Sequence, residues 1–144
     1  MLIEEALTRR VIGCVYRVYN VLGSGLPESV YVGALAHECE KNGMLAQREF
    51  PIAVSYDAVI VGSFRADLLI DRRLIIEVKA CPLHPSHHAQ VLTYVRCSDV
   101  EVALLISFDD KPRVKRFLMR NAVKPLLRVP PVQESRPPHA ADRD

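Results

Sequence analysis

Apolar residues recur at helical spacing along the first part of the chain. This spacing predicts an amphipathic helix over residues 3–22, which the Gly-Ser-Gly sequence at 23–25 ends. Proline is favoured in the first turn of a helix, so Pro27 opens a second predicted helix, which ends at Asn42 and Gly43. The apolar series of the first helix is Ile3, Leu7, Val11, Val15, Val18 and Leu22.

The pattern then changes to extended runs of β-branched and apolar residues, separated by short polar breaks. Such runs are typical of strands, and a further helix is predicted from Pro85-Ser86. The resulting order is two helices, a strand meander, a helix and two strands, which indicates an α/β fold. The strands are predicted over residues 50–56, 59–61, 64–70, 74–80, 100–107 and 114–119.

The length of 144 residues suits one compact domain, which we assign to residues 1–124. Residues 125–144 contain five prolines and several charges without periodicity, so a disordered tail is predicted there. The sequence contains neither a membrane-spanning apolar run nor a signal-peptide pattern, and a cytoplasmic location is expected. Four irregularly spaced cysteines suggest neither a disulfide framework nor a zinc ribbon.

Basic charge is concentrated toward the C-terminal end. Up to Asp110 there are 10 Lys and Arg against 14 Asp and Glu, and from Lys111 onward there are 9 against 3. Such a segment can neutralise the phosphates of a nucleic acid, but it is also typical of an ordinary solvated terminus.

Two acidic residues and a lysine lie on neighbouring predicted strands. Alternation along a strand places Glu77 and Lys79 on one face. If a three-residue turn is centred on Arg72, Asp67 lies across from Glu77 and Arg65 across from Lys79, whereas a two-residue turn breaks this arrangement. Facing carboxylates repel and require a cation, for which Mg²⁺ or Mn²⁺ is suited. The alternative is a solvated hairpin face on which Lys79 and Arg65 form ion pairs.

An aspartate followed by Glu-x-Lys resembles the PD-(D/E)XK nuclease superfamily, although Ala66 replaces the proline of its motif. Residues 25–31, Gly-Leu-Pro-Glu-Ser-Val-Tyr, match the GxxExxY signature of one branch. Gln90 and Tyr94 match the QxxxY motif of RecB-like members. The resemblance spans residues 11–119. It implies a restriction-endonuclease-like core, in which a mixed central β-sheet is flanked by α-helices.

The resemblance also implies Mg²⁺-dependent, or Mn²⁺-dependent, hydrolysis of a nucleic acid, DNA in particular, by a metal-activated water. Asp67, Glu77 and the Val78 carbonyl are the implied metal ligands, and Glu28 supplies a further carboxylate. Lys79 orients the water or stabilises the developing charge.

Further residues are implied to contact the substrate. Gln90 holds the nucleic-acid backbone or the geometry of the site, and Tyr94 lies one helical turn further on the same face. His88, or its neighbour His87, is expected at the start of the third helix, where it contacts phosphate or positions Gln90, and Arg65 is a further expected substrate contact.

Each role has a purely structural alternative. Glu28 is also what a helix dipole favours in a first turn, and Tyr31 is also typical of a core aromatic. Gln90 and Tyr94 are equally compatible with a surface amide and a half-buried ring. Residues 81–88 offer Cys and His side chains for zinc, but two prolines interrupt them and no distant ligand pair completes a tetrahedral set.

The alternative function is a nucleic-acid-binding or protein-interaction module that keeps the nuclease fold without cleaving. The small size of the chain favours reliance on a partner protein or a homodimer, since no separate DNA-reading domain is present.

Overall fold

The structure, a computed structural model, describes residues 3–125. Helix α1 (Glu5–Leu22) confirms the first predicted helix. Helix α2 (Glu28–Lys41) has Pro27 and Asn42 as its caps, close to the predicted bounds. The predicted tail at 125–144 lies outside the described residues beyond Pro125.

Five strands form one sheet in the order β1-β2-β3-β4-β5. All neighbouring pairs are antiparallel except β3 and β4, which are parallel. Helix α3 (Pro85–Cys97) connects this parallel pair, which requires a crossover, and a short 3₁₀ helix (Asn121–Val123) follows the sheet. The mixed sheet flanked by helices is therefore confirmed. The strands are β1 (Ala46–Tyr56), β2 (Val59–Ile70), β3 (Leu74–Lys79), β4 (Val102–Phe108) and β5 (Pro112–Leu118).

The predicted break between strands at 59–61 and 64–70 is wrong. Gly62 and Ser63 are weak strand formers, but they stay paired with Val54 and Ala53 of β1, so β2 continues through them. Pairing with a neighbouring strand outweighs local strand preference here.

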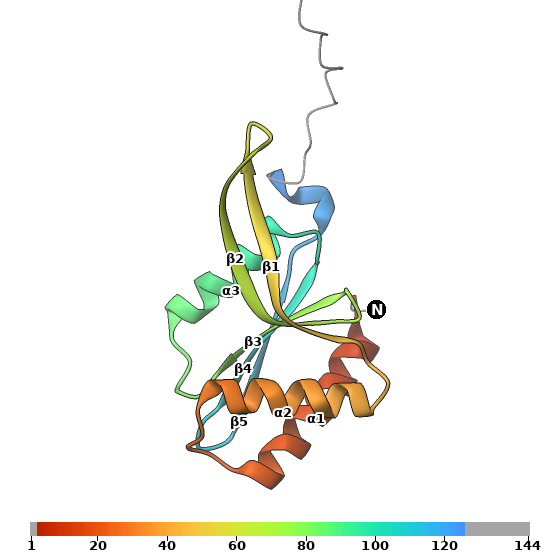
Figure 1. Cartoon of the computed structure of the whole chain (residues 1–144), viewed down its shortest axis with the longest axis vertical. Coiled ribbons are helices and arrows are strands. Elements are labelled where there is room, and N and C mark those ends of the chain that lie inside the picture. Colours follow the sequence, from red (N-terminus) through yellow and green to blue (C-terminus); the bar gives the residue numbers. More distant parts are fainter. Residues whose placement is uncertain (1–2, 126–144) are drawn as a thin grey trace, which may run out of the picture.

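Each face of the sheet has its own hydrophobic core, and Figure 1 shows α1 and α2 on one side of the sheet and α3 on the other. Helices α1 and α2 cover one face, where Tyr31 and Leu35 pack on β-strand residues such as Leu104. Helix α3 covers the other face, where Val91 and Val95 pack beside β4 and β5. Because side chains alternate along a strand, β3 contributes to both cores.

The β1–β2 hairpin extends beyond the rest of the sheet as a two-stranded arm (Figure 1). Strand β2 pairs with β3 only over its last three residues, 68–70, and its earlier residues pair with β1. The apolar residues near the end of the arm are exposed, namely Tyr56, Val59, Ile60 and Val61. Asp67 therefore lies on β2 at the point where the arm joins the rest of the sheet.

Candidate active site

The turn between β2 and β3 is the three-residue turn, one of the two alternatives that the sequence left open. Ile70 pairs with Leu74 and Leu68 with Ile76, which places the centre of a three-residue turn at Arg72. The β2–β3 pairing ends at Leu68, one position before the expected pair of Asp67 and Glu77. Beyond this point the strands separate, and the Val78 N–H donates to Oδ2 of Asp67 at 2.8 Å instead of to a main-chain carbonyl.

The expected cross-strand pair of Arg65 and Lys79 is wrong. Arg65 pairs with Pro51 of β1, and its guanidinium lies 3.8 Å from the Glu49 carboxylate. The physical reason is that the pairing of β2 with β3 ends at Leu68, so Arg65 has no aligned partner on β3. A role for Arg65 in substrate binding stays a prediction.

Glu77 is a buried acid that lies beside Asp67. Its side chain is only 3% exposed, and its Oε2 has no hydrogen-bond partner among the described residues. Burial raises the pKa of Glu77 to about 9, assisted by the neighbouring Asp67 carboxyl group. Lys79 and Tyr94 offset this pKa shift only in part. The two carboxyl groups therefore require a shared proton or a bound cation.

Helix α3 adds Gln90 and Tyr94 to the carboxyl pair. The Gln90 amide donates to the Tyr94 hydroxyl oxygen at 2.8 Å, which leaves the hydroxyl hydrogen available to Glu77. Tyr94 is buried, and burial together with the charge of Glu77 raises the pKa of its phenol. The Phe64 ring lies 5.8 Å from that of Tyr94, so the base of the arm borders the site.

Lys79 ends β3 on the same face as Glu77, as alternation along the strand requires. Its aligned neighbour on β4 is Ser107, whose hydroxyl donates to the Cys81 carbonyl at 2.6 Å. This hydrogen bond holds the segment that follows Lys79 against β4. The lysine is therefore positioned at the carboxyl end of the parallel strand pair.

Tyr31 of the GxxExxY segment is a core residue, as its structural alternative predicted. Its ring is fully buried and stacks on Phe108 with centroids 4.4 Å apart. Its hydroxyl donates to the Gly23 carbonyl at 2.6 Å and accepts from the Leu26 N–H at 3.3 Å. These contacts fix the start of α2 at the carboxyl end of β4.

Glu28 consequently lies at the sheet edge where Lys79 ends β3, because parallel strands end at the same edge. Both charges act on His87: burial and Lys79 lower the pKa of that imidazole, and Glu28 opposes the shift. Residues 3–125 contain no group of three or more Asp, Glu, His or Cys side chains placed to hold a metal. The described structure thus brings Asp67 and Glu77 together without Glu28 as a third ligand.

Two histidines of α3 differ in their surroundings. His87 Nδ1 accepts from the His84 N–H at 3.1 Å, as part of the cap of α3. His88 Nδ1 lies 3.3 Å from Nζ of Lys115 on β5. Sequence analysis did not select Lys115. Lys115 and the buried Phe117 are two residues apart on one strand, so the sequence indicates that they share a sheet face. Only the order of the strands places that face near the site.

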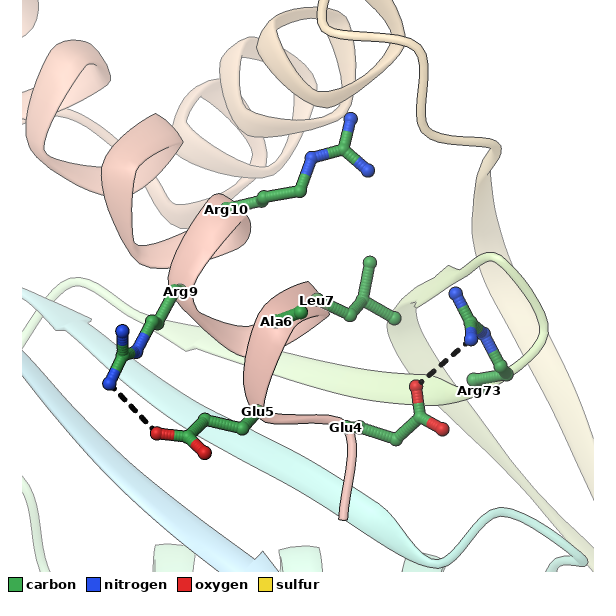
Figure 2. Close-up of a pocket in the computed structure, with 7 residues that line it drawn as sticks. All are labelled: Glu4, Glu5, Ala6, Leu7, Arg9, Arg10 and Arg73. Carbon is green, nitrogen blue, oxygen red and sulfur yellow. Dashed lines mark hydrogen bonds and ion pairs between the residues drawn. The ribbon is translucent and has the colours of Figure 1, made fainter. Parts of the chain in front are cut away.

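A cavity of about 540 Å³ lies elsewhere, at the start of α1 (Figure 2). Its three arginines already have partners: Arg73 lies 3.4 Å from Glu4, Arg9 lies 2.8 Å from Glu5, and Arg10 donates to the Asn42 carbonyl. Arg73 precedes β3, whereas Lys79 ends it, so this cavity does not belong to the candidate active site.

None of the helices within residues 3–125 combines the length and apolar character that crossing a membrane requires.

Comparison with known proteins gives one family. The model described as "PD-(D/E)XK nuclease superfamily" matches residues 5–117. No curated protein matches the chain. Among solved structures, an alkaline exonuclease (LHK-Exo) from Laribacter hongkongensis is similar, with 16% identity and a TM-score of 0.39. That match covers 83% of this chain and 84% of the exonuclease chain.

Proposed function

Because the chain belongs to the PD-(D/E)XK nuclease superfamily, we propose that it is a metal-dependent nuclease that hydrolyses phosphodiester bonds of DNA. The observation that carries this proposal is the carboxyl pair of Asp67 and Glu77 with Lys79 beside it. The motif residues 25–31, Gln90 and Tyr94 support the finer assignment to the GxxExxY, RecB-like branch.

The carboxyl pair suits a hard divalent cation. The unpartnered Oε2 of Glu77 and the neighbouring Asp67 carboxylate offer negatively charged oxygens, which Mg²⁺ and Mn²⁺ prefer. Two carboxylates are sufficient for Mg²⁺, which keeps several waters and takes the remaining ligands from substrate phosphates. We assign Asp67, Glu77 and the Val78 carbonyl as ligands. Glu28, at the start of α2, supplies a further carboxylate to the site. When bound, the cation would polarise the scissile phosphate and make an attacking water more acidic.

The protein's own side chains then orient the reaction. The Lys79 ammonium lies on the Glu77 side of the sheet, where it can hold the attacking water or stabilise negative charge that develops on the phosphate. The Gln90 amide holds the Tyr94 hydroxyl, which in turn favours the ionised form of Glu77. These contacts oppose the rise in the pKa of Glu77 and so help a cation to displace its proton.

Substrate contacts follow from the same arrangement. Gln90 and Tyr94 lie on the α3 side of the carboxyl pair, and His88 lies nearly two helical turns before Tyr94 on the same helix. We assign these three residues and Arg65 to substrate binding. The exposed position of Arg65 on β2 leaves it free to exchange its Glu49 partner for a phosphate.

A cleavage assay tests the proposal. End-labelled single-stranded and double-stranded DNA and RNA are incubated with the protein in Mg²⁺, Mn²⁺ or EDTA. Lys79→Ala is compared with Lys41→Ala, which removes an exposed lysine at the far end of α2 from Glu28. We expect metal-dependent cleavage by the wild type and by Lys41→Ala, and at least a hundredfold slower cleavage by Lys79→Ala.

The outcomes separate the two functions that the sequence suggested. Nucleic-acid binding without cleavage under any metal condition would favour the non-cleaving module. Equal cleavage by Lys79→Ala and the wild type would place the chemistry elsewhere. Calorimetry that detects no Mg²⁺ or Mn²⁺ binding, together with no cleavage, would refute the nuclease proposal.

A further inference from the structure

The sheet aligns a second basic position with the candidate active site. Glu77 on β3 pairs with Leu105 on β4, and Leu105 pairs with Lys115 on β5. Aligned residues on neighbouring strands point to the same face, and each strand adds about 4.8 Å. Lys115 therefore lies on the α3 face of the sheet, about 10 Å across it from Glu77.

Contacts of neighbouring residues agree with this placement. Leu105 and Phe117 both belong to the hydrophobic core beneath α3, together with Tyr94. The exposed ammonium of Lys115 lies 5.8 Å from the centroid of the Phe117 ring, on the side where His88 approaches. The His88 and Phe117 rings are also 5.8 Å apart. A lysine and a histidine are thus held side by side on a buried aromatic.

Lys115 also determines which nitrogen of His88 carries the hydrogen. A lysine ammonium can only donate, so His88 Nδ1 must accept at 3.3 Å, and the neutral ring then carries its hydrogen on Nε2. Lys115 Nζ and His88 Nε2 are therefore both donors. Among residues 3–125, no carboxylate lies within ion-pair distance of either side chain, whereas Arg113 on the same strand is paired with Asp110 at 2.5 Å.

We propose that Lys115 and His88 together bind a phosphate of the nucleic-acid strand next to the one that is cleaved. Leu105 is fully buried beneath α3, so the strand runs from the carboxyl pair toward β5 around the start of that helix, where His88 contacts Lys115. A lysine that faces a histidine without an acid nearby is suited to an anion, and phosphate is the anion that a nuclease substrate supplies repeatedly. This inference rests on the proposed function.

The opposite path is less suited to a phosphate backbone. On the β2 side of the carboxyl pair, Arg65 must first exchange its Glu49 partner for a phosphate, and the arm beyond it ends in the exposed apolar residues around Ile60. The path toward β5 offers Lys115 and His88, which have no acid partner among residues 3–125. The position of the charges therefore sets the direction of the bound strand.

The first test measures DNA binding by fluorescence anisotropy, with a fluorescein-labelled oligonucleotide in EDTA so that cleavage does not occur. Lys115→Ala should weaken binding about three- to tenfold, and the slope of log Kd against log salt should fall by about 0.7 to 0.9. Lys41→Ala, which removes the same charge from the far end of α2, should change neither. Lys115→Arg should restore most of the affinity, since it retains the charge. Lys115 is exposed, and thermal unfolding verifies that each variant is folded.

The second test locates the contacted phosphate. Methylphosphonate replaces single phosphates along the oligonucleotide, so that each probe lacks one negative charge. At one position adjacent to the cleaved bond, the replacement should weaken binding by the wild type and have no effect on Lys115→Ala. Equal loss at every position in both proteins would overturn the subsite.

The two proposals fail in different ways. Wild-type protein that binds DNA, with Lys115→Ala matching Lys41→Ala in affinity and salt slope, would overturn this inference and leave the nuclease proposal intact. Wild-type protein that neither binds nor cleaves DNA or RNA would overturn the proposed function, and the phosphate subsite with it.

Discussion

Glu77→Gln removes the charge of the buried carboxyl group at nearly constant shape. In the unfolded chain the pKa of this residue is about 4.5, and in the folded protein it is raised to about 9. The folded state therefore binds more protons than the unfolded state between these values, so wild-type stability falls as pH rises through that window. A glutamine side chain does not ionise, so the variant does not lose stability in this way as pH rises.

The size of the effect follows from the same two pKa values. Each pH unit within the window corresponds to about 1.4 kcal/mol. Without metal, Glu77→Gln should be more stable than the wild type by about 1 kcal/mol at pH 5, about 3 kcal/mol at pH 7 and about 5 kcal/mol at pH 8. Glu77 is nearly inaccessible to solvent, so screening by water reduces these values little.

Urea unfolding followed by circular dichroism at pH 5 and pH 8, in EDTA, measures this difference. Glu40→Gln provides the matched control, because it removes an exposed carboxylate from α2 and should give the same small change at both pH values. A Glu77→Gln variant with equal stability changes at pH 5 and pH 8 would refute the argument. So would a variant that is less stable than the wild type at both.

Four further predictions use the same structure. Mg²⁺ or Mn²⁺ at a hundred times its Kd should stabilise the wild type by about 2.7 kcal/mol in thermal unfolding, and Asp67→Ala should abolish this gain; an equal gain in both proteins would contradict the ligand assignment. The Kd for Mg²⁺, measured by calorimetry, should fall up to about tenfold for each pH unit between pH 6 and pH 8, because the metal must displace the proton that Glu77 retains below its raised pKa; a flat profile would argue against this. Tyr31→Phe should cost about 1–3 kcal/mol in urea unfolding because the Gly23 carbonyl loses its donor, and an unchanged denaturation midpoint would show that the hydroxyl contributes nothing. Lys124→Met should cost a similar amount, since the buried ammonium donates to the carbonyls of Ser98 at 2.9 Å and Val100 at 2.7 Å; the same unfolding experiment would reveal a neutral substitution.

The local pattern of residue types along the sequence was sufficient to predict much of the fold. The helical spacing of apolar residues predicted α1, and the proline and glycine signals placed the ends of α2 within a residue or two. The sequence limited the β2–β3 turn to two alternatives, because a hairpin is a short-range structure, and the structure has the three-residue turn centred on Arg72. The same local reasoning missed the continuity of β2 at Gly62 and Ser63. These residues have a low intrinsic preference for strands, but their pairing with β1 keeps them in β2.

Part of the candidate site could be predicted from the sequence in the same way. Asp67, Glu77 and Lys79 could be selected together because they lie close along the chain, on two strands that one turn connects. Gln90 and Tyr94 were selected because they match the QxxxY motif. Their hydrogen bond at 2.8 Å, and the access of Tyr94 to Glu77, depend on how α3 packs across the sheet.

Sequence alone thus determined which residue types are present, their periodicity and the short hairpin that places two acids near a lysine. Only the tertiary structure decided that β2 leaves β3 beside Asp67, that Glu77 is buried enough to retain a proton, and that Lys115 faces the same side of the sheet. The physical reason is that burial and electrostatic coupling depend on neighbours in space. Strand order and helix packing bring those neighbours together from distant parts of the chain.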